Sequence, residues 1–87
     1  MYYVYLIQHN ETKEFYVGFT ENLESRVNAH NLGQNDSTKR KSGEWILIYY
    51  EAFKSEIDAR NRERKLKNHG KGKQELLKRL VNSVSGV

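Results

Sequence analysis

Apolar and polar positions alternate in two short segments near the start of the chain, and this pattern predicts a β-hairpin. Residues 2–7 form an aromatic and β-branched run that is too short for a helix and ends in a turn-prone stretch. In residues 15–19 the alternation places two phenylalanines and a valine on one face and Tyr16 on the other, beside Gly18. A strand glycine leaves room for a neighbouring element or a substrate backbone to approach closely.

Helical periodicity follows the hairpin and predicts a helix over residues 21–32. Thr20 can cap its N-terminus, and Gly33 is suited to end it. At about 100° per residue, Arg26 and His30 lie one turn apart at the edge of the apolar stripe. We therefore expect both side chains to face inward or across a cleft.

A loop and a long apolar run follow this helix. Residues 33–43 are polar and show no periodicity, which predicts a loop. This loop carries the triplet Lys39, Arg40 and Lys41, which is suited to close over a bound phosphate chain. Residues 45–53 are the most apolar stretch and predict the central or longest strand, where the core should be densest.

Two further helices are predicted in the second half of the chain. Ser55, with an aspartate three residues later, begins a helix that runs to about residue 68. Glu63 occupies an inward-facing position of this helix between an alanine and a leucine, which is unusual for a single carboxylate. Residues 70–73 are rich in glycine and break the chain before a short third helix with a leucine stripe.

The composition limits the fold to one small core. Of the 87 residues, 37% are hydrophobic and 30% are charged, and no apolar run approaches the roughly 20 residues of a membrane-spanning helix. We expect one α/β (α+β) domain over residues 1–82, with a mainly antiparallel three-stranded sheet, three flanking helices and a frayed tail at 83–87. The chain has no cysteine and no secretory signal pattern, so we expect a cytoplasmic location and no thiolate metal site.

Positive charge is concentrated near the C-terminal end. Residues 60–79 contain nine Lys or Arg and two Glu, a net charge of +7, whereas the whole chain carries +4. A basic segment on an otherwise acidic small protein indicates a polyanionic partner, with nucleic acid ahead of a membrane surface. The alternative is that these side chains simply solvate an exposed helix.

Several short motifs, in their order and spacing, resemble the GIY-YIG nuclease domain. Tyr3-Val4-Tyr5 matches the first family motif and Tyr16-Val17-Gly18 the second. Ten residues after Tyr16 comes Arg26, followed by His30 and Asn31, and the second predicted helix carries a matching glutamate, Glu63. The resemblance covers about residues 2–80 and is strongest to small stand-alone bacterial members and to structure-selective junction nucleases.

The resemblance implies metal-dependent hydrolysis of phosphodiester bonds, with a role for each of five residues. Glu63 would hold one divalent cation, Mg²⁺ or Mn²⁺, and leave the other coordination positions to water and phosphate oxygens. Tyr16 would act as general base, and Arg26 would bind the non-bridging phosphate oxygens. Tyr5 would orient the water or Tyr16, and His30 would donate to the phosphate or assist proton transfer.

Each of these residues also has an ordinary structural alternative. The two tyrosines could form a cross-strand aromatic pair, Arg26 could extend from the edge of the apolar stripe, and His30 could be a hydrogen-bonded core imidazole. Glu63 could pair with Lys67 or with Arg26. Two positions depart from the family pattern. Phe19 stands where some members carry a basic residue, and Glu75 stands where many carry an asparagine, a role left to Asn68 or a lysine.

Taken together, these features predict a metal-dependent endonuclease that acts on DNA rather than RNA and does not bind membranes. Lys67, Lys71 and Lys73 are candidate phosphate contacts, as is the basic triplet of the loop. No second domain is present to contact base edges, so specificity would come from the shape of the DNA, such as a repair or recombination intermediate, or from a partner protein. The alternative from another class is a nucleic-acid-binding module that keeps the fold without catalysis.

Overall fold

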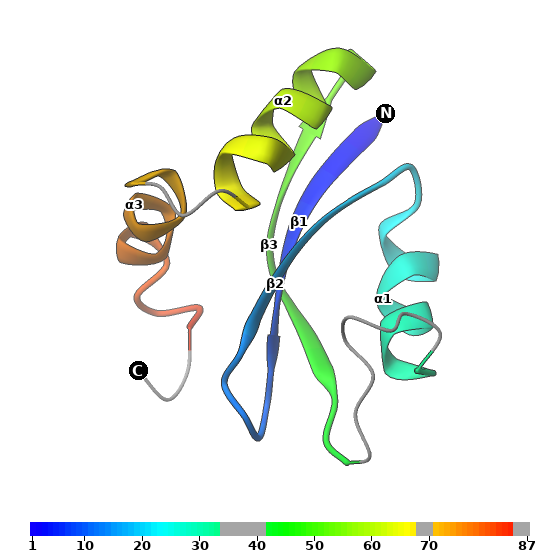
Figure 1. The fold of residues 1–87 in the computed structure, drawn as a ribbon. Coiled ribbons are helices and arrows are strands. Elements are labelled where there is room, and N and C mark those ends of the chain that lie inside the picture. Colours follow the sequence, from blue (N-terminus) through cyan, green and yellow to red (C-terminus); the bar gives the residue numbers. More distant parts are fainter. Residues whose placement is uncertain (34–41, 68–70, 85–87) are drawn as a thin grey trace.

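The computed structural model describes residues 1–33, 42–67 and 71–84. The elements within these residues are β1 (Tyr2–His9), β2 (Phe15–Thr20), α1 (Leu23–Asn31), β3 (Trp45–Phe53), α2 (Glu56–Lys67) and α3 (Lys71–Arg79). The strands form one antiparallel sheet in the order β2-β1-β3 (Figure 1). The predicted α+β fold, with a three-stranded antiparallel sheet and three helices, is confirmed.

Helices cover both faces of the sheet, with α1 on one side and α2 and α3 on the other (Figure 1). Successive side chains of a strand point to opposite faces, so β1 contributes to both layers. Under α2 and α3 the buried core consists of Val4, Leu6, Val17, Ala59, Leu66 and Leu76. Under α1 the buried core consists of Tyr5, Ile7 and Trp45, with Tyr16, Leu23, Val27 and Leu47 packed against it. The fully buried aromatic side chains of these clusters therefore lie in the α1 layer, whereas the aromatic residues of the α2 and α3 layer are partly buried.

The central strand is β1, and β3 lies at an edge of the sheet. The prediction that residues 45–53 form the longest strand is correct, but the expectation that the core is densest there is wrong. Residues 4–9 of β1 are all buried, whereas Trp45 is the buried residue of β3. The reason is that β1 has a strand on each side and a helical layer on each face, while one side of β3 has no neighbouring strand.

Helix α1 begins two residues later than predicted. Its N-cap is Asn22, whose side chain accepts a hydrogen bond from the Ser25 amide at 3.1 Å. The Thr20 hydroxyl instead binds the backbone of Asn22, accepting from its amide at 3.0 Å and donating to its carbonyl at 3.1 Å. Thr20 therefore closes the turn between β2 and α1. Gly33 ends the helix as predicted, with φ of +73° and an amide that donates to the His30 carbonyl.

The start of α2 agrees with the sequence prediction, and the start of α3 differs from it. Ser55 caps α2 as predicted, because its hydroxyl accepts from the Asp58 amide at 3.3 Å. Helix α3 already begins at Lys71, so the stretch at 70–73 does not separate the helices as far as we expected. No helix in the described part of the chain is both long enough and apolar enough to span a membrane.

Candidate active site

Three of the five predicted site residues meet on the α1 side of the sheet. Tyr5 comes from β1, Tyr16 from β2 and His30 from α1. The Tyr5 hydroxyl lies 2.7 Å from His30 Nε2, within hydrogen-bond distance. The His30 ring is 4.9 Å from that of Tyr16 and 5.8 Å from that of Tyr5, and the two tyrosine rings are 6.4 Å apart. The predicted aromatic pair therefore exists, and the imidazole joins it.

Gly18 makes this arrangement possible. In the β1–β2 register Gly18 lies directly opposite Tyr5. A Cβ at position 18 would overlap the Tyr5 hydroxyl, so the phenol lies across the backbone of the edge strand where no side chain stands. The sequence left open whether a neighbouring element or a substrate backbone approaches this glycine, and in the structure the Tyr5 side chain does so.

Burial keeps Tyr5 and His30 uncharged near neutral pH. Burial, together with electrostatic interactions with Tyr16 and Glu63, raises the pKa of Tyr5, while Arg26 opposes part of this shift. Burial and the positive charge of Arg26 lower the pKa of His30. The hydrogen bond between Tyr5 and His30 is thus one between neutral groups, and its direction depends on which imidazole nitrogen carries the proton.

The end of α1 that carries His30 is tied to β3 by the side chain of Asn31. The Asn31 side chain accepts a hydrogen bond from the Trp45 amide at 2.6 Å and donates to the Trp45 carbonyl at 3.1 Å. These two bonds tie the last turn of α1 to the start of β3. Asn31 belongs to the family motif, but the sequence does not indicate this tie, because Trp45 lies 14 residues away.

Glu63 approaches the site from the opposite layer, around the edge formed by β2. Its side chain is 14% exposed, and Oε2 lies 2.9 Å from Lys67 Nζ. Lys67 Nζ also lies 5.7 Å from the centre of the Tyr16 ring. Lys67 thus bridges the carboxylate of one layer and the phenol of the other. Such a meeting requires β2 to be an edge strand, because a further strand beside it would separate the two layers.

The ion pairs of Glu63 match one of the two alternatives left open by the sequence. Its described partners are Lys67 and Arg60, the latter with Nη1 at 3.7 Å from Oε1, and both belong to the same helix. Arg26 is exposed on α1, and its charge acts on the pKa values of Tyr5 and His30. Arg26 therefore lies at the open side of the site, within electrostatic range of the buried pair.

Of the remaining predicted residues, Lys73 contacts β2, Lys71 and Glu75 are exposed, and the others lie outside the described part of the chain. Lys73 Nζ lies 5.8 Å from the centre of the Phe15 ring on β2, whereas Lys71 is exposed at the start of α3. Glu75 is also exposed on α3. The predicted phosphate contacts of the loop, Lys39, Arg40 and Lys41, lie outside the described residues, as does Asn68.

One basic residue near the site was not predicted. The Arg60 guanidinium lies 3.7 Å from the centre of the Phe19 ring. Phe19 is the position at which some family members carry a basic side chain, so a cation reaches this position from α2 instead. The i, i+3 spacing of Arg60 and Glu63 was visible in the sequence, but the contact across to β2 was not.

Glu63 is chemically suited to bind a divalent metal ion. Carboxylate oxygens are preferred ligands of Mg²⁺, which retains several water molecules and often takes only one or two protein carboxylates together with phosphate oxygens. The described residues contain no cluster of three or more His, Cys, Asp or Glu side chains that could hold a metal by themselves. A metal at Glu63 would therefore depend on water and phosphate ligands, and it would take the place of the Lys67 ammonium at Oε2.

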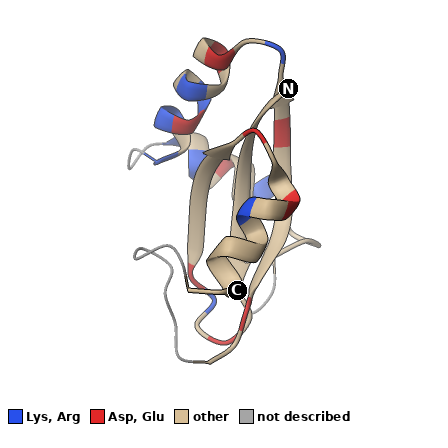
Figure 2. Ribbon diagram, turned by 90° about the vertical axis from the view of Figure 1, so that its right-hand side faces the viewer, with Lys and Arg blue, Asp and Glu red and all other residues tan. Residues whose placement is uncertain are grey.

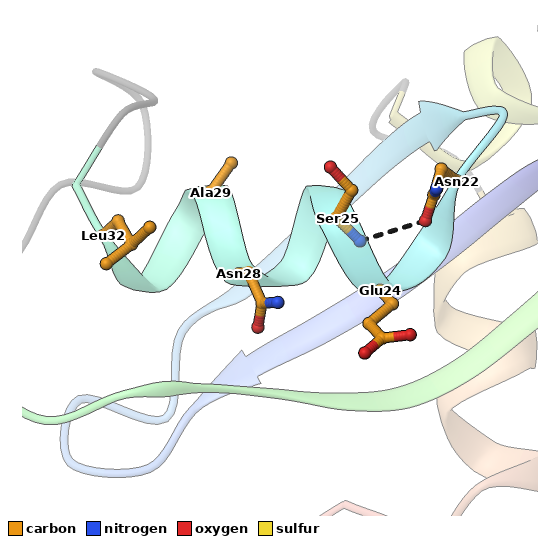
Figure 3. Close-up of a pocket in the computed structure, with 6 residues that line it drawn as sticks. All are labelled: Asn22, Glu24, Ser25, Asn28, Ala29 and Leu32. Atoms are coloured by element: carbon orange, nitrogen blue, oxygen red, sulfur yellow. Dashed lines mark hydrogen bonds between the residues drawn. The ribbon is translucent and has the colours of Figure 1, made fainter.

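A shallow pocket on the exposed side of α1 is separate from this site (Figure 3). It is lined by Asn22, Glu24, Ser25, Asn28, Ala29 and Leu32. Figure 3 shows the cap hydrogen bond from the Ser25 amide to the Asn22 side chain within it. None of the predicted catalytic residues lines this pocket, so we assign it no part in the chemistry.

Comparison with known proteins agrees with this geometry. The chain matches the family described as the GIY-YIG catalytic domain over residues 1–75. It is 38% identical over 63 residues to the UPF0213 protein CPE1444 of Clostridium perfringens, covering 72% of this chain and 67% of that protein. It is 32% identical over 85 residues to the UPF0213 protein NP_0776A of Natronomonas pharaonis, covering 98% and 95% of the two chains.

A solved structure resembles the fold as well. The solution NMR structure of the UPF0213 protein BH0048 from Bacillus halodurans matches with a TM-score of 0.55 and 28% sequence identity, covering 92% of this chain and 85% of that one. GIY-YIG domains are typically endonucleases and generally use divalent metal ions such as Mg²⁺. The family match extends from β1 into α3 and includes all five residues of the candidate site. This chain therefore belongs to the GIY-YIG family of nuclease domains.

Proposed function

We propose that this protein is a Mg²⁺- or Mn²⁺-dependent endonuclease that hydrolyses phosphodiester bonds in DNA. The observation that supports this most directly is the meeting of Tyr5, Tyr16 and His30 with the Glu63–Lys67 pair around the edge of β2. These groups come from four different elements. Together they offer a carboxylate, phenols, an imidazole and cations around one position, which is what phosphodiester hydrolysis requires.

Glu63 would hold the metal ion, which when bound supplies charge neutralisation at the phosphate and a more acidic water ligand. Tyr16 would act as general base in its phenolate form, after its own proton has passed to solvent. The phenolate would then accept the proton of the attacking water. The neutral Tyr5–His30 pair would fix the Tyr16 ring by packing against it. The proton shared between the Tyr5 hydroxyl and His30 Nε2 would lie on the inner side of the site. Arg26 would bind the non-bridging oxygens with its planar set of donors.

Selection of the DNA would rest on its shape. Lys67, Lys71 and Lys73, and the basic triplet at 39–41, would contact phosphates, which carry no sequence information by themselves. We therefore expect a preference for branched, flapped or nicked DNA such as repair and recombination intermediates. A partner protein could add further specificity.

A second candidate function is a nucleic-acid-binding module without catalysis. The observation in its favour is the ion pairing of Glu63 with Lys67 and Arg60, which gives this carboxylate a structural role without any metal. This module would bind nucleic acid through its basic helices in a salt-sensitive way but would not cleave it.

A cleavage assay separates the two candidates. Purified protein is incubated with nicked, flapped and branched DNA in Mg²⁺, Mn²⁺ or EDTA, beside Glu63→Ala and Tyr16→Phe. Matched controls are Glu44→Ala, an exposed carboxylate before β3, and Tyr50→Phe, a half-exposed phenol on β3. Metal-dependent cleavage that both site variants abolish and both controls retain supports the enzyme. Salt-sensitive binding without cleavage by the unaltered protein would refute it.

A further inference from the structure

Positively charged side chains from α2 and α3 lie over the aromatic rings of the edge strand β2. Lys and Arg positions recur along α2 (Figure 2), but their side chains differ in what they contact. Three of the cations sit against rings of β2. They are Arg60 at 3.7 Å from Phe19, Lys67 at 5.7 Å from Tyr16 and Lys73 at 5.8 Å from Phe15, measured to the ring centres.

These three cations form a row, which we call the β2 track. The rings stand at positions 15, 16 and 19 of one strand. Phe15 and Phe19 pack in the layer of α2 and α3 and Tyr16 packs in the layer of α1, so the row follows the edge of β2, around which Lys67 reaches. Contact with a ring face is electrostatically favourable and limits the rotamers of a long side chain. The cations of the track thus lie beside rings next to the site, whereas Arg64, Lys65 and Lys78 on the same two helices have no such ring contact among the described residues.

The length of the track fits a short piece of one nucleic-acid strand. From residue 15 to residue 19 a β-strand advances about 13 Å, at about 3.3 Å per residue. Along the axis of a duplex one strand rises about 3.4 Å per nucleotide, so the track matches about four base-pair steps of a duplex that lies parallel to it. Lys67, which touches both Glu63 and Tyr16, lies within the row. A strand on the track therefore passes the candidate active site.

We propose that the β2 track binds the sugar–phosphate backbone of the DNA strand that is cut. Arg60, Lys67 and Lys73 act as its phosphate ligands, and Arg60 belongs to the basic segment 60–79 but was not singled out there as a phosphate contact. The proposal rests on the proposed function for the position of the scissile phosphate, which is beside Lys67. All three groups are cations that meet phosphates and not base edges, so binding along the track is independent of sequence.

The same cations have a competing explanation. Charged side chains on an edge strand also prevent the strand from pairing with another sheet, and this role requires no ligand. The two explanations differ in what the removal of charge does. Loss of edge protection leads to self-association of the protein. Loss of phosphate ligands instead lowers the affinity for DNA and makes that affinity less dependent on salt concentration.

Two triple variants with equal charge test the proposal. One replaces Arg60, Lys67 and Lys73 by Gln, and the other replaces Arg64, Lys65 and Lys78 by Gln. Binding of a fluorescent branched DNA is measured by anisotropy in EDTA, so that binding is separated from cleavage, over a range of salt concentrations. Thermal unfolding and sedimentation of each variant check its folding and association state.

We expect a large difference between the two variants. Each lost phosphate contact reduces the slope of log K against log salt by about 0.9, so the track variant should lose about 2.7 and the control less than about 1. At 0.1 M salt the track variant should bind about 100-fold more weakly than the unaltered protein. Equal weakening by both variants, or self-association of the track variant with unchanged DNA affinity, would overturn the proposal.

A measurement on the unaltered protein covers the case in which the triple variant does not fold. Lysines are acetylated in the presence and absence of DNA, and the extent at each position is read by mass spectrometry. DNA should protect Lys67 and Lys73 several-fold more than Lys65 and Lys78, and equal protection would refute the track. Cleavage with Mg²⁺ is scored separately, so a track without hydrolysis and hydrolysis without a track are distinct results.

Discussion

Two partly buried carboxylates of this protein, Glu51 and Glu63, differ in how they are held. Glu51, on β3, receives a planar pair of hydrogen bonds from Arg62 on α2, with Nε–Oε1 and Nη2–Oε2 both at 2.9 Å. The Tyr49 hydroxyl donates a further bond to Oε2 at 2.7 Å. Glu63 instead pairs with Lys67 and Arg60 of its own helix. Since the side chains are 21% and 14% exposed, burial does not distinguish them.

The difference lies in whether the partners can leave. Burial alone would raise the pKa of Glu51, but hydrogen bonds from Arg62 and Tyr49 more than offset it and lower this pKa below its ordinary value. The paired hydrogen bonds from Arg62 join α2 to β3. Together with the bond from Tyr49 they occupy both oxygens of Glu51, so this carboxylate is closed to other ligands. Lys67 carries a compact charge on a flexible stem, which can turn away from Glu63. We therefore expect Glu63, whose cations come from its own helix, to exchange them for a metal ion more readily than Glu51 would.

The largest expected effect tests the open carboxylate. Glu63→Gln should reduce the rate of DNA cleavage by at least about 100-fold, because it removes the ligand for the ion that balances charge on the reacting phosphate. The free energy of unfolding should change by less than about 0.5 kcal/mol, since only ion pairs within one helix, to two half-exposed cations, are weakened. Cleavage of nicked DNA and urea denaturation measure the two quantities. Full activity of this variant would remove the distinction between the two carboxylates.

The closed carboxylate should show the reverse pattern. Glu51→Gln should lower the free energy of unfolding by about 2 kcal/mol, because Arg62 then lacks its charged partner. The rate of cleavage per folded molecule should remain. Replacing both partners, as Glu51→Leu with Arg62→Met, should recover part of the loss, since no unpaired charge remains. Unchanged urea denaturation of Glu51→Gln would show that this network does not stabilise the protein.

The pH dependence of stability extends the comparison to the α1 layer. Burial and Arg26 lower the pKa of His30 in the folded protein, so the unfolded chain takes up a proton first as the pH falls below about 6.5. The folded protein should lose stability from this pH down to the folded-state pKa of His30. Thermal unfolding at pH 7.5 and pH 5.5 should show a smaller loss for His30→Gln than for the unaltered protein. Because the other two histidines are common to both proteins, equal losses would contradict the assignment.

The smallest expected effect compares the cations themselves. Lys67→Met should change the free energy of unfolding by less than about 0.5 kcal/mol, as expected for an i, i+4 pair on a helix. Arg62→Met, which removes the paired hydrogen bonds to Glu51, should lower the free energy of unfolding by about 2 kcal/mol. Urea denaturation of the two variants measures both losses in the free energy of unfolding, and hence their ratio. Similar costs for both would mean that the Glu63 pair is as structural as the Glu51 pair.

Local patterns predicted most of the elements because each depends on neighbouring residues. The alternation around Tyr16 and the cap at Ser55 were both recognisable without knowledge of the rest of the chain. The start of α1 was misplaced because Thr20 and Asn22 are both good caps, and only the turn after β2 selects between them. The same limitation applies to the position of residues 45–53 at an edge of the sheet, since strand order is set by contacts between distant segments.

The candidate site was predicted as a set of residue types, and the structure added how they meet. That Glu63 faces inward followed from helical spacing. That Lys67 links it to Tyr16, and that Arg60 lies on Phe19, required the packing of α2 across β2. The tie from Asn31 to the start of β3 likewise depended on a tertiary contact.

The order of residues along the chain alone specified the hairpin, the helices, the basic C-terminal segment and the motifs of a GIY-YIG domain. These features follow from periods of two and 3.6 residues and from side-chain chemistry, which act over short distances. Tertiary packing alone decided that β2 is an edge, that two helical layers meet around it, and that Glu51 is bound by an arginine and a tyrosine from other positions of the fold. Such features depend on which distant segments become neighbours, and no local period encodes that choice.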